Sequence, residues 1–308
     1  MKKSIHLLLG ICLLLITSSI VLAQNVLVDT QKSYANIKTI EVSGGWLDVS
    51  YQGGSSSGVN VDAYLASNDT DQDIVFVTIG DVLKISLERK QNNYSWNSRN
   101  KGYIQITGPE SMNIKFRNSS GTLTVDRVTS PETSLQVTSG KITASNIDGD
   151  LYMVATSGNL GANGVSGNVS AKLTSGNASI NQVNGNVEYE STSGSLDADG
   201  VRGTLSAYLT SGNAKLNNIG ALGKLQFTSG NIRATMAGLS DQTQLSGTSG
   251  NFTIQTNSDL KSFNFALKSS SGNLKVGNIS TGKTLDIDNG TSTTIRGTIS
   301  SGNITIQN

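Results

Sequence analysis

The sequence predicts an all-β protein built mainly as a parallel β-helix, a β-solenoid with about 18 residues per coil in two nine-residue halves. Three observations predict this class. Glycine recurs at intervals of nine residues, apolar and polar residues alternate between the glycines, and residues 24–118 show strand patterns without the repeat. A fixed short period is typical of a solenoid, and alternation by two is typical of a strand with one buried face.

Residues 1–23 have the layout of a secretory signal peptide. Lys2 and Lys3 precede an apolar run from Leu7 to Leu22, and the small residue Ala23 precedes the expected cleavage before Gln24. Cys12 lies inside the apolar run, so we expect no lipid anchor at the cleavage point. We expect an exported product in the periplasm, at the cell surface or outside the cell. No later apolar run is long enough to cross a bilayer, so we expect no membrane insertion after cleavage.

Cleavage also changes the chemical inventory of the chain. Without Lys2 and Lys3, 21 basic residues face 22 acidic ones, and the net charge falls from +1 to −1. A chain without a basic field is not expected to bind nucleic acid. The single Cys (Cys12) and the single His (His6) leave with the peptide, which removes thiolate ligands, the usual general base and the commonest imidazole metal ligand. We therefore expect no cofactor and no metal.

Residues 24–118 are predicted to form a β-rich cap with irregular or antiparallel pairing. Stretches such as "WLDVSY" and "VNVDAYL" alternate like strands, and an open solenoid end needs such a cover for its unpaired edge groups. We expect Trp46, Tyr51 and Tyr64 in the core of this cap.

The stretch from Gln91 to Tyr103 is the most distinctive loop in the sequence. It places Tyr94, Trp96 and Tyr103 among amide and guanidinium side chains, a composition that suits the faces and hydroxyls of sugar rings. These three residues are the candidate ligand contacts. The alternative is a long hairpin whose aromatic side chains fold back onto the cap.

Residues 119–308 are predicted to form the solenoid, and a turn ladder marks its coils. Each turn glycine is expected at positive φ, which glycine adopts at little cost, and the Asn that follows is expected to stack coil upon coil and satisfy turn backbone groups. The predicted ladder consists of Gly140, Gly158, Gly176, Gly194, Gly212 and Gly230, with Asn159, Asn177, Asn213 and Asn231.

The apolar positions of each unit predict which side chains point inward. The third and fifth residues counted from each glycine are mostly apolar, as in Leu160 and Ala162, and their neighbours are polar. One half of the coil then continues the alternation, as at Leu173, whereas the other half shifts by one position, as at Val165 and Val183. This shift indicates a bend that turns the next apolar residue inward again.

Beyond Gly230 the glycine spacing loosens, with turn glycines at Gly250, Gly272, Gly290 and Gly302. Additional residues in a solenoid form loops on one face, either as a binding feature or as tolerated drift. The end of the chain, "SGNITIQN", carries no recognisable cap. We expect this end either to fray or to pair with another chain.

The acidic residues do not predict a catalytic centre. The densest acids fall on opposite half-coils, Glu188 and Glu190 on one and Asp197 and Asp199 on the other. Glycoside hydrolysis needs two facing carboxylates, and calcium-binding nonapeptide rolls need an Asp that these turns lack. The coil register instead places Lys172 beside Glu190 and Lys215 beside Asp197. We expect a protein that is not an enzyme.

The stretches "TGPESMNIKFRNSSGTLTV" and "VTSGKITASNIDGDLYMVATSGNL" resemble a bacterial family of exported domains of unknown function named putative adhesins. The resemblance implies a signal peptide, a short β-rich N-terminal part and Ser-Gly-Asn/Asp β-helix repeats. The function it implies is a cell-envelope or surface protein that presents a rigid β-helix to a glycan or a protein partner, in an oligomeric state left open. The alternatives are a carbohydrate-active β-helix enzyme and a structural envelope component without a specific ligand.

Overall fold

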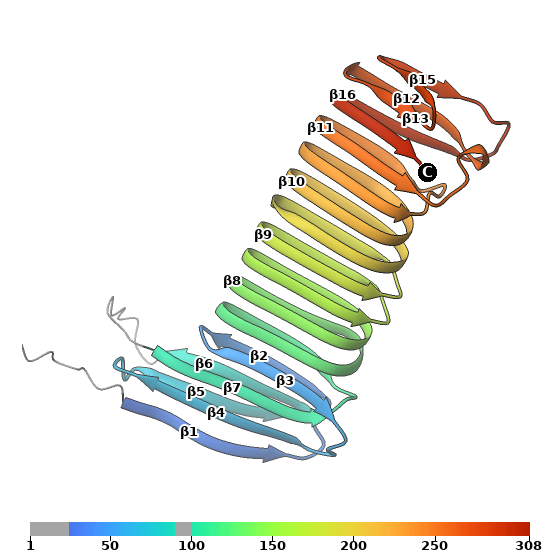
Figure 1. Ribbon diagram of the computed structural model, residues 1–308. Coiled ribbons are helices and arrows are strands. Elements are labelled where there is room, and N and C mark those ends of the chain that lie inside the picture. Colours follow the sequence, from blue (N-terminus) through green and yellow to red (C-terminus); the bar gives the residue numbers. More distant parts are fainter. Residues whose placement is uncertain (1–24, 90–99) are drawn as a thin grey trace, which may run out of the picture.

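The structure is a computed structural model that describes residues 25–89 and 100–308. The expected signal peptide and the candidate residues Tyr94 and Trp96 lie outside the described residues. The protein is all-β, with a largely parallel sheet and antiparallel N-terminal strands (Figure 1). The strands are β1 (Asn25–Tyr34), β2 (Thr39–Gly45), β3 (Asp48–Gly54), β4 (Val59–Ser67), β5 (Gln72–Ile79), β6 (Val82–Arg89), β7 (Asn100–Pro109), β8 (Asn113–Val165), β9 (Val169–Val183), β10 (Val187–Ala237), β11 (Gln244–Thr256), β12 (Asn264–Ser271), β13 (Leu274–Val276), β14 (Ile279–Thr281), β15 (Thr284–Ile287) and β16 (Thr294–Gln307).

Strands β8 to β11 form an elongated pile of parallel segments, here called the parallel stack (residues 113–256). Leu151 pairs with Val169, and Val169 pairs with Val187, so that neighbouring segments are offset by one pair of nine-residue units. Leu160, Ala178 and Leu196 are aligned in the same way. The sequence period therefore gives the pairing register in this part of the chain.

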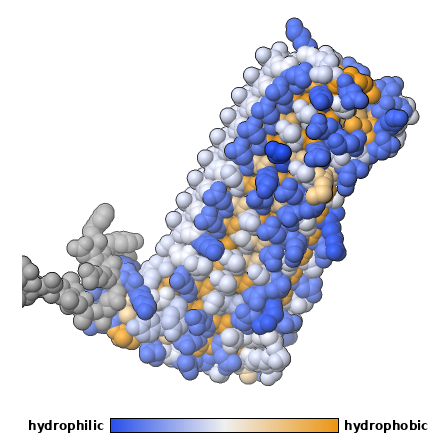
Figure 2. All heavy atoms as spheres, in the orientation of Figure 1, coloured by the Kyte–Doolittle hydropathy of each residue, from blue (hydrophilic) through white to orange (hydrophobic). Residues whose placement is uncertain are grey.

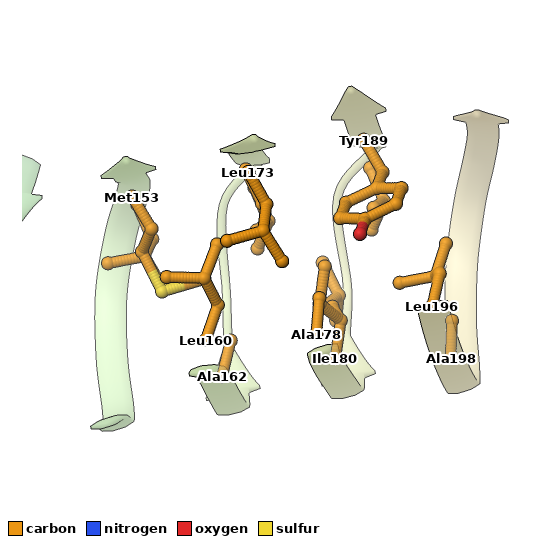
Figure 3. Close-up of a cluster of buried hydrophobic side chains, with 14 of the residues drawn as sticks. Met153, Leu160, Ala162, Leu173, Ala178, Ile180, Tyr189, Leu196 and Ala198 are labelled. Atoms are coloured by element: carbon orange, nitrogen blue, oxygen red, sulfur yellow. The ribbon is translucent and has the colours of Figure 1, made fainter. Parts of the chain in front are cut away.

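The inward-pointing side chains form continuous apolar columns through the stack (Figure 3). Leu160, Ala178 and Leu196 are each at most 3% exposed, as the third position of the unit predicts. Tyr189 is fully buried in the adjacent column and pairs with Ala171, whose small side chain leaves room for the ring. Each large aliphatic side chain buried in this way contributes about 1.5–3 kcal/mol to stability.

A row of residues in the left-handed conformation forms the bend in the second half of each coil. Its members, one from each successive coil, are Asn146 (φ 53°), Gly164 (71°), Gln182 (55°), Gly200 (72°), Asn218 (51°) and Met236 (52°). Each precedes a buried apolar residue such as Val165 or Val183. This geometry is the physical cause of the shift from odd to even apolar positions, and Gly and Asn tolerate it best.

The N-terminal region continues the parallel stack before it turns antiparallel. Ile40 of β2 pairs with Ile114, and Val49 of β3 pairs with Leu123, both in parallel, so the expected boundary at residues 118/119 falls inside β8. On one side β3 is followed by β7, β4 and β1, with β4 and β1 antiparallel. On the other side β2 is followed by β6 and the antiparallel β5.

The aromatic residues of this region divide between the core and the surface. Tyr51 is buried, and its hydroxyl donates a hydrogen bond to the Pro109 carbonyl. Trp46 packs against the core and donates from Nε1 to Gln72 Oε1 at 2.9 Å. The expectation for Tyr64 is wrong, because Ala63 and Leu65 take the inward positions of β4 and leave Tyr64 half-buried on the outer face.

At the far end, β16 lies between β11 and β12 in space although it follows both in sequence. Gly302 pairs with Gly250 on one side, and Ser301 pairs with Ser271 on the other. Strand β15 then pairs with β12, and β14 pairs with β13, both antiparallel. The expectation of an end that frays or pairs with another chain is therefore wrong for β16, which is paired on both sides.

Candidate functional site

The turn glycines are required by the close approach of neighbouring backbones. A Cβ atom built on Gly176 would lie 1.8 Å from the carbonyl oxygen of Gly158, and its φ is +132°. The φ angles of Gly140, Gly158, Gly212 and Gly230 are +157°, +139°, +146° and +152°. Gly194 has no positive φ, and at its turn the Tyr189 hydroxyl donates to the Ser195 carbonyl at 3.4 Å.

The asparagines after the turn glycines hydrogen-bond to one another along the stack. Asn177 donates to Asn159 at 3.5 Å, and Asn231 donates to Asn213 at 3.1 Å from its side chain and at 3.2 Å from its backbone. Ser195 interrupts the row between Asn177 and Asn213. These amides bond to neighbouring coils, which supports a structural role for the ladder.

A second polar ladder, which the sequence reasoning did not single out, runs along the half-way glycines. Asp150 Oδ1 accepts the backbone N–H of Asn168 at 2.7 Å, Asn168 Oδ1 accepts that of Asn186 at 2.9 Å, and Asn186 Oδ1 accepts that of Thr204 at 2.8 Å. Each member directly follows one of the glycines at positions 149, 167, 185 and 203, which is the sequence signal that could have revealed it.

Tyr103, the one candidate ligand contact among the described residues, belongs to a surface here called the tyrosine patch (Gln31, Asp62, Tyr64, Tyr103 and Gln105). Tyr103 on β7 pairs with Tyr64 on β4, and their rings stack with centroids 5.8 Å apart and an interplanar angle of 22°. Asp62 lies in the next row between Gln31 and Gln105, and Gln31 Nε2 donates to its Oδ2 at 3.2 Å. Two aromatic rings therefore stand beside a carboxylate and two amides.

The Tyr103 phenol titrates above its ordinary range. Desolvation raises the pKa of Tyr103, and the charge of Asp62 and a hydrogen bond to it raise that pKa further. Because the neutral phenol donates to Asp62, the patch presents an oriented acceptor and donor pair at neutral pH.

The acids singled out in the sequence lie on two different surfaces of the stack. Glu188 lines a groove with Tyr152 and Ser170, whereas Asp197 lines another with Asn159 and Asn177. Figure 2 shows hydrophilic residues over much of the stack's outer surface.

Lysines one coil away accompany two of these acids, as the register predicts. Lys172 Nζ lies 3.1 Å from Glu190, and Lys215 Nζ lies 4.0 Å from Asp197. The hydrogen bond and the charge of Glu190 raise the pKa of Lys172. Within residues 25–89 and 100–308, no group of three or more His, Cys, Asp or Glu side chains could hold a metal ion.

The parallel register, the glycine turns and the antiparallel N-terminal strands define a toastrack-like all-β protein. The chain belongs to the Toastrack DUF4097 family, whose model matches residues 37–307. This match confirms the family resemblance drawn from the Ser-Gly-Asn repeats. No curated protein matches the chain.

Solved structures from several bacteria are similar to this chain at low identity. A putative lipid binding protein from Parabacteroides distasonis is 13% identical, with a TM-score of 0.45, over 91% of this chain and 96% of that one. A putative adhesin from Bacteroides fragilis is 10% identical, with a TM-score of 0.34, over 90% and 96%. A putative cell adhesion protein from Clostridium sporogenes is 13% identical, with a TM-score of 0.22, over 91% and 99%. In the part of the chain that the structure describes, no helix is long and apolar enough to span a membrane.

Proposed function

We propose that the protein is an exported, non-enzymatic component of the bacterial cell envelope or surface that binds a glycan through the tyrosine patch. The observation that carries this proposal is the stacked pair of Tyr64 and Tyr103 beside Asp62. Aromatic rings contact the C–H faces of sugars, while carboxylate and amide groups bond to the hydroxyls. Gln31 and Gln105 supply those amides on the two flanking strands.

The framework proposed to carry the patch is a β-solenoid in which each coil contains two of the nine-residue units. Three aligned sets support it: the regular pairing of Leu151, Val169 and Val187, the same offset between Leu160, Ala178 and Leu196, and the recurring left-handed bend. Side chains placed on paired strands hold their positions better than side chains on loops, which suits a preformed binding surface.

The absence of catalysis is part of the proposal and rests on the chemistry of the acids. Glu190 and Asp197 lie beside lysines and on different surfaces, so they do not form the facing pair that glycoside hydrolysis needs. Incubation of the protein with a panel of polysaccharides should release no product. Turnover that is lost on Glu188→Gln or Asp197→Asn would instead establish the carbohydrate-active enzyme.

Binding of the secreted protein to glycan arrays and to isolated cell walls tests the proposed function. Tyr64→Ala and Tyr103→Ala should each lower the affinity at least about tenfold, while Tyr103→Phe should retain the ring contact and lose the hydrogen bond to Asp62. Tyr152→Ala, on the parallel stack, is the matched control and should leave this binding unchanged. If the protein binds no glycan, or if the Tyr64 and Tyr103 variants bind as well as the wild type, the proposal is wrong and a structural role is favoured.

A further inference from the structure

We propose that a second site lies on the side of the parallel stack and takes a linear oligosaccharide carrying free amino groups. The site is the groove that contains Tyr152, Ser170, Glu188, Ser206, Tyr208 and Lys224, here called the lateral groove. It is separate from the tyrosine patch and goes beyond the function proposed there.

The lateral groove runs along the stack with one polar side chain per coil. Tyr152 pairs with Ser170, and Ser170 pairs with Glu188, so these side chains follow one another at the strand spacing of about 4.8 Å. Ser206 and Lys224 occupy the equivalent positions of the next two coils and continue the same column. An extended sugar chain advances by a comparable length per ring, so successive rings meet equivalent hydrogen-bonding groups.

Two tyrosines bound the central part of the lateral groove. Tyr152 lies three coils from Ser206, whose neighbour along the strand is Tyr208, which places the two rings about 14 Å apart along the stack. Both side chains are partly exposed. They provide two stacking platforms with room for about three sugar rings between their ends.

The wall of the lateral groove offers unused hydrogen-bond donors. Asn186 accepts the Thr204 backbone N–H with its oxygen. Its side-chain amide nitrogen donates to no protein group in the described parts of the chain, and so it faces the groove as a donor. Ser170 and Ser206 add hydroxyls on the opposite side. These groups match the hydroxyls of a sugar chain.

The charge of the lateral groove selects the kind of sugar. Four carboxylates (Glu132, Asp150, Glu188 and Asp241) line the groove against one cation, Lys224, which gives a net charge of −3. Glu188 forms no ion pair within residues 25–89 and 100–308, whereas the nearby Lys172 is held by Glu190. The groove therefore repels uronic and sialic acids and attracts protonated amino groups.

A basic peptide fits the lateral groove less well than an amino sugar does. The floor of the groove is a sheet face whose backbone N–H and C=O groups already pair with the coils on either side. An added peptide strand would have no free edge to bond to, and peptide recognition by strand addition needs such an edge.

Calorimetry on the secreted protein with three probes tests this site: a β-1,4-linked glucosamine tetramer, the same tetramer N-acetylated, and tetralysine. The glucosamine tetramer should bind, and its affinity should fall at least about tenfold on N-acetylation and fall further with added salt. Glu188→Gln and Tyr152→Ala should each weaken binding about tenfold or more. Asp197→Asn and Tyr64→Ala are matched controls outside the groove and should leave it unchanged.

Three results would overturn the proposal. They are no binding of the glucosamine tetramer by the folded protein, equal binding of the N-acetylated tetramer, and tetralysine binding of the same strength that Tyr152→Ala does not weaken. Unchanged circular dichroism and melting temperature of each variant show that it is folded. Because Tyr64→Ala affects the tyrosine patch alone, loss of one site is distinguishable from loss of the other.

Discussion

Asn303 donates a hydrogen bond from its side-chain amide to Asn251 Oδ1 at 2.8 Å, although the two residues are 52 positions apart in the chain. On its other side, Asn303 Oδ1 accepts the backbone N–H of Asn273 at 2.9 Å. The asparagine row therefore runs 251, 303, 273 in space, which places β16 inside the sheet.

We predict that Ile304→Asp lowers the free energy of unfolding by about 3 kcal/mol or more, because an unpaired charge would be buried there. Ile304 is fully buried and pairs with Phe252 on one side and Leu274 on the other. Thr305→Asp, one residue on, is the control and should cost far less. Urea unfolding measures both, and a silent Ile304→Asp would show that β16 does not occupy this position.

The faces of the parallel stack are tested at two adjacent residues. Val187 is 1% exposed, and Glu188 is exposed on the outer face. Val187→Asp should cost several kcal/mol, whereas Glu188→Ser should change stability by about 0.5 kcal/mol or less. Thermal melts of both variants provide the measurement, and similar melting temperatures would mean that the two faces are assigned wrongly.

A single methyl group tests the close packing of the turns. Gly176→Ala should destabilise the protein by about 2 kcal/mol or more, because the new Cβ meets the Gly158 carbonyl and φ is positive. Gly54→Ala has open space around its Cβ and no positive φ, so it should be nearly neutral. Chemical denaturation compares the two variants, and equal midpoints would contradict the steric argument.

Alkaline pH should destabilise the protein through its buried tyrosines. Burial raises the pKa of Tyr51 and of Tyr189 above the ordinary value of 10.0. The free energy of unfolding is therefore independent of these groups below about pH 10 and decreases above it, because the unfolded chain ionises first. The slope is at most about 1.4 kcal/mol per pH unit for each tyrosine.

Urea titrations between pH 8 and pH 11 measure this dependence. Tyr189→Phe should be less sensitive to alkali than the wild type, after correction for its own change in stability at pH 8. A wild-type protein whose stability is constant throughout this range would show that both phenols ionise freely.

The regular middle of the fold was predictable because its register is local. The offset between paired segments and the inward positions of Leu160 and Ala178 follow from period and alternation alone. The left-handed row was not predicted, because Gln182 and Met236 carry no glycine signal although their backbone angles match those of Gly164 and Gly200.

The two ends and the sites were harder to predict for a different reason. The pairing of Ile40 with Ile114 and that of Gly250 with Gly302 each join strands several coils apart in the chain, so neither follows the repeat. The partner of Tyr103 in the tyrosine patch, Tyr64, depends on the antiparallel register of β4 and β7, which the sequence pattern does not fix. The second polar ladder was visible in sequence, at the residue after each half-way glycine.

The uniform register between Leu151 and Val201 makes the length of the molecule adjustable in whole steps. Duplication or loss of one coil in the gene would move the tyrosine patch relative to β12–β15 by about 4.8 Å and leave both intact. Evolution can therefore set how far the patch reaches beyond its attachment point by counting units, in the manner of a molecular ruler.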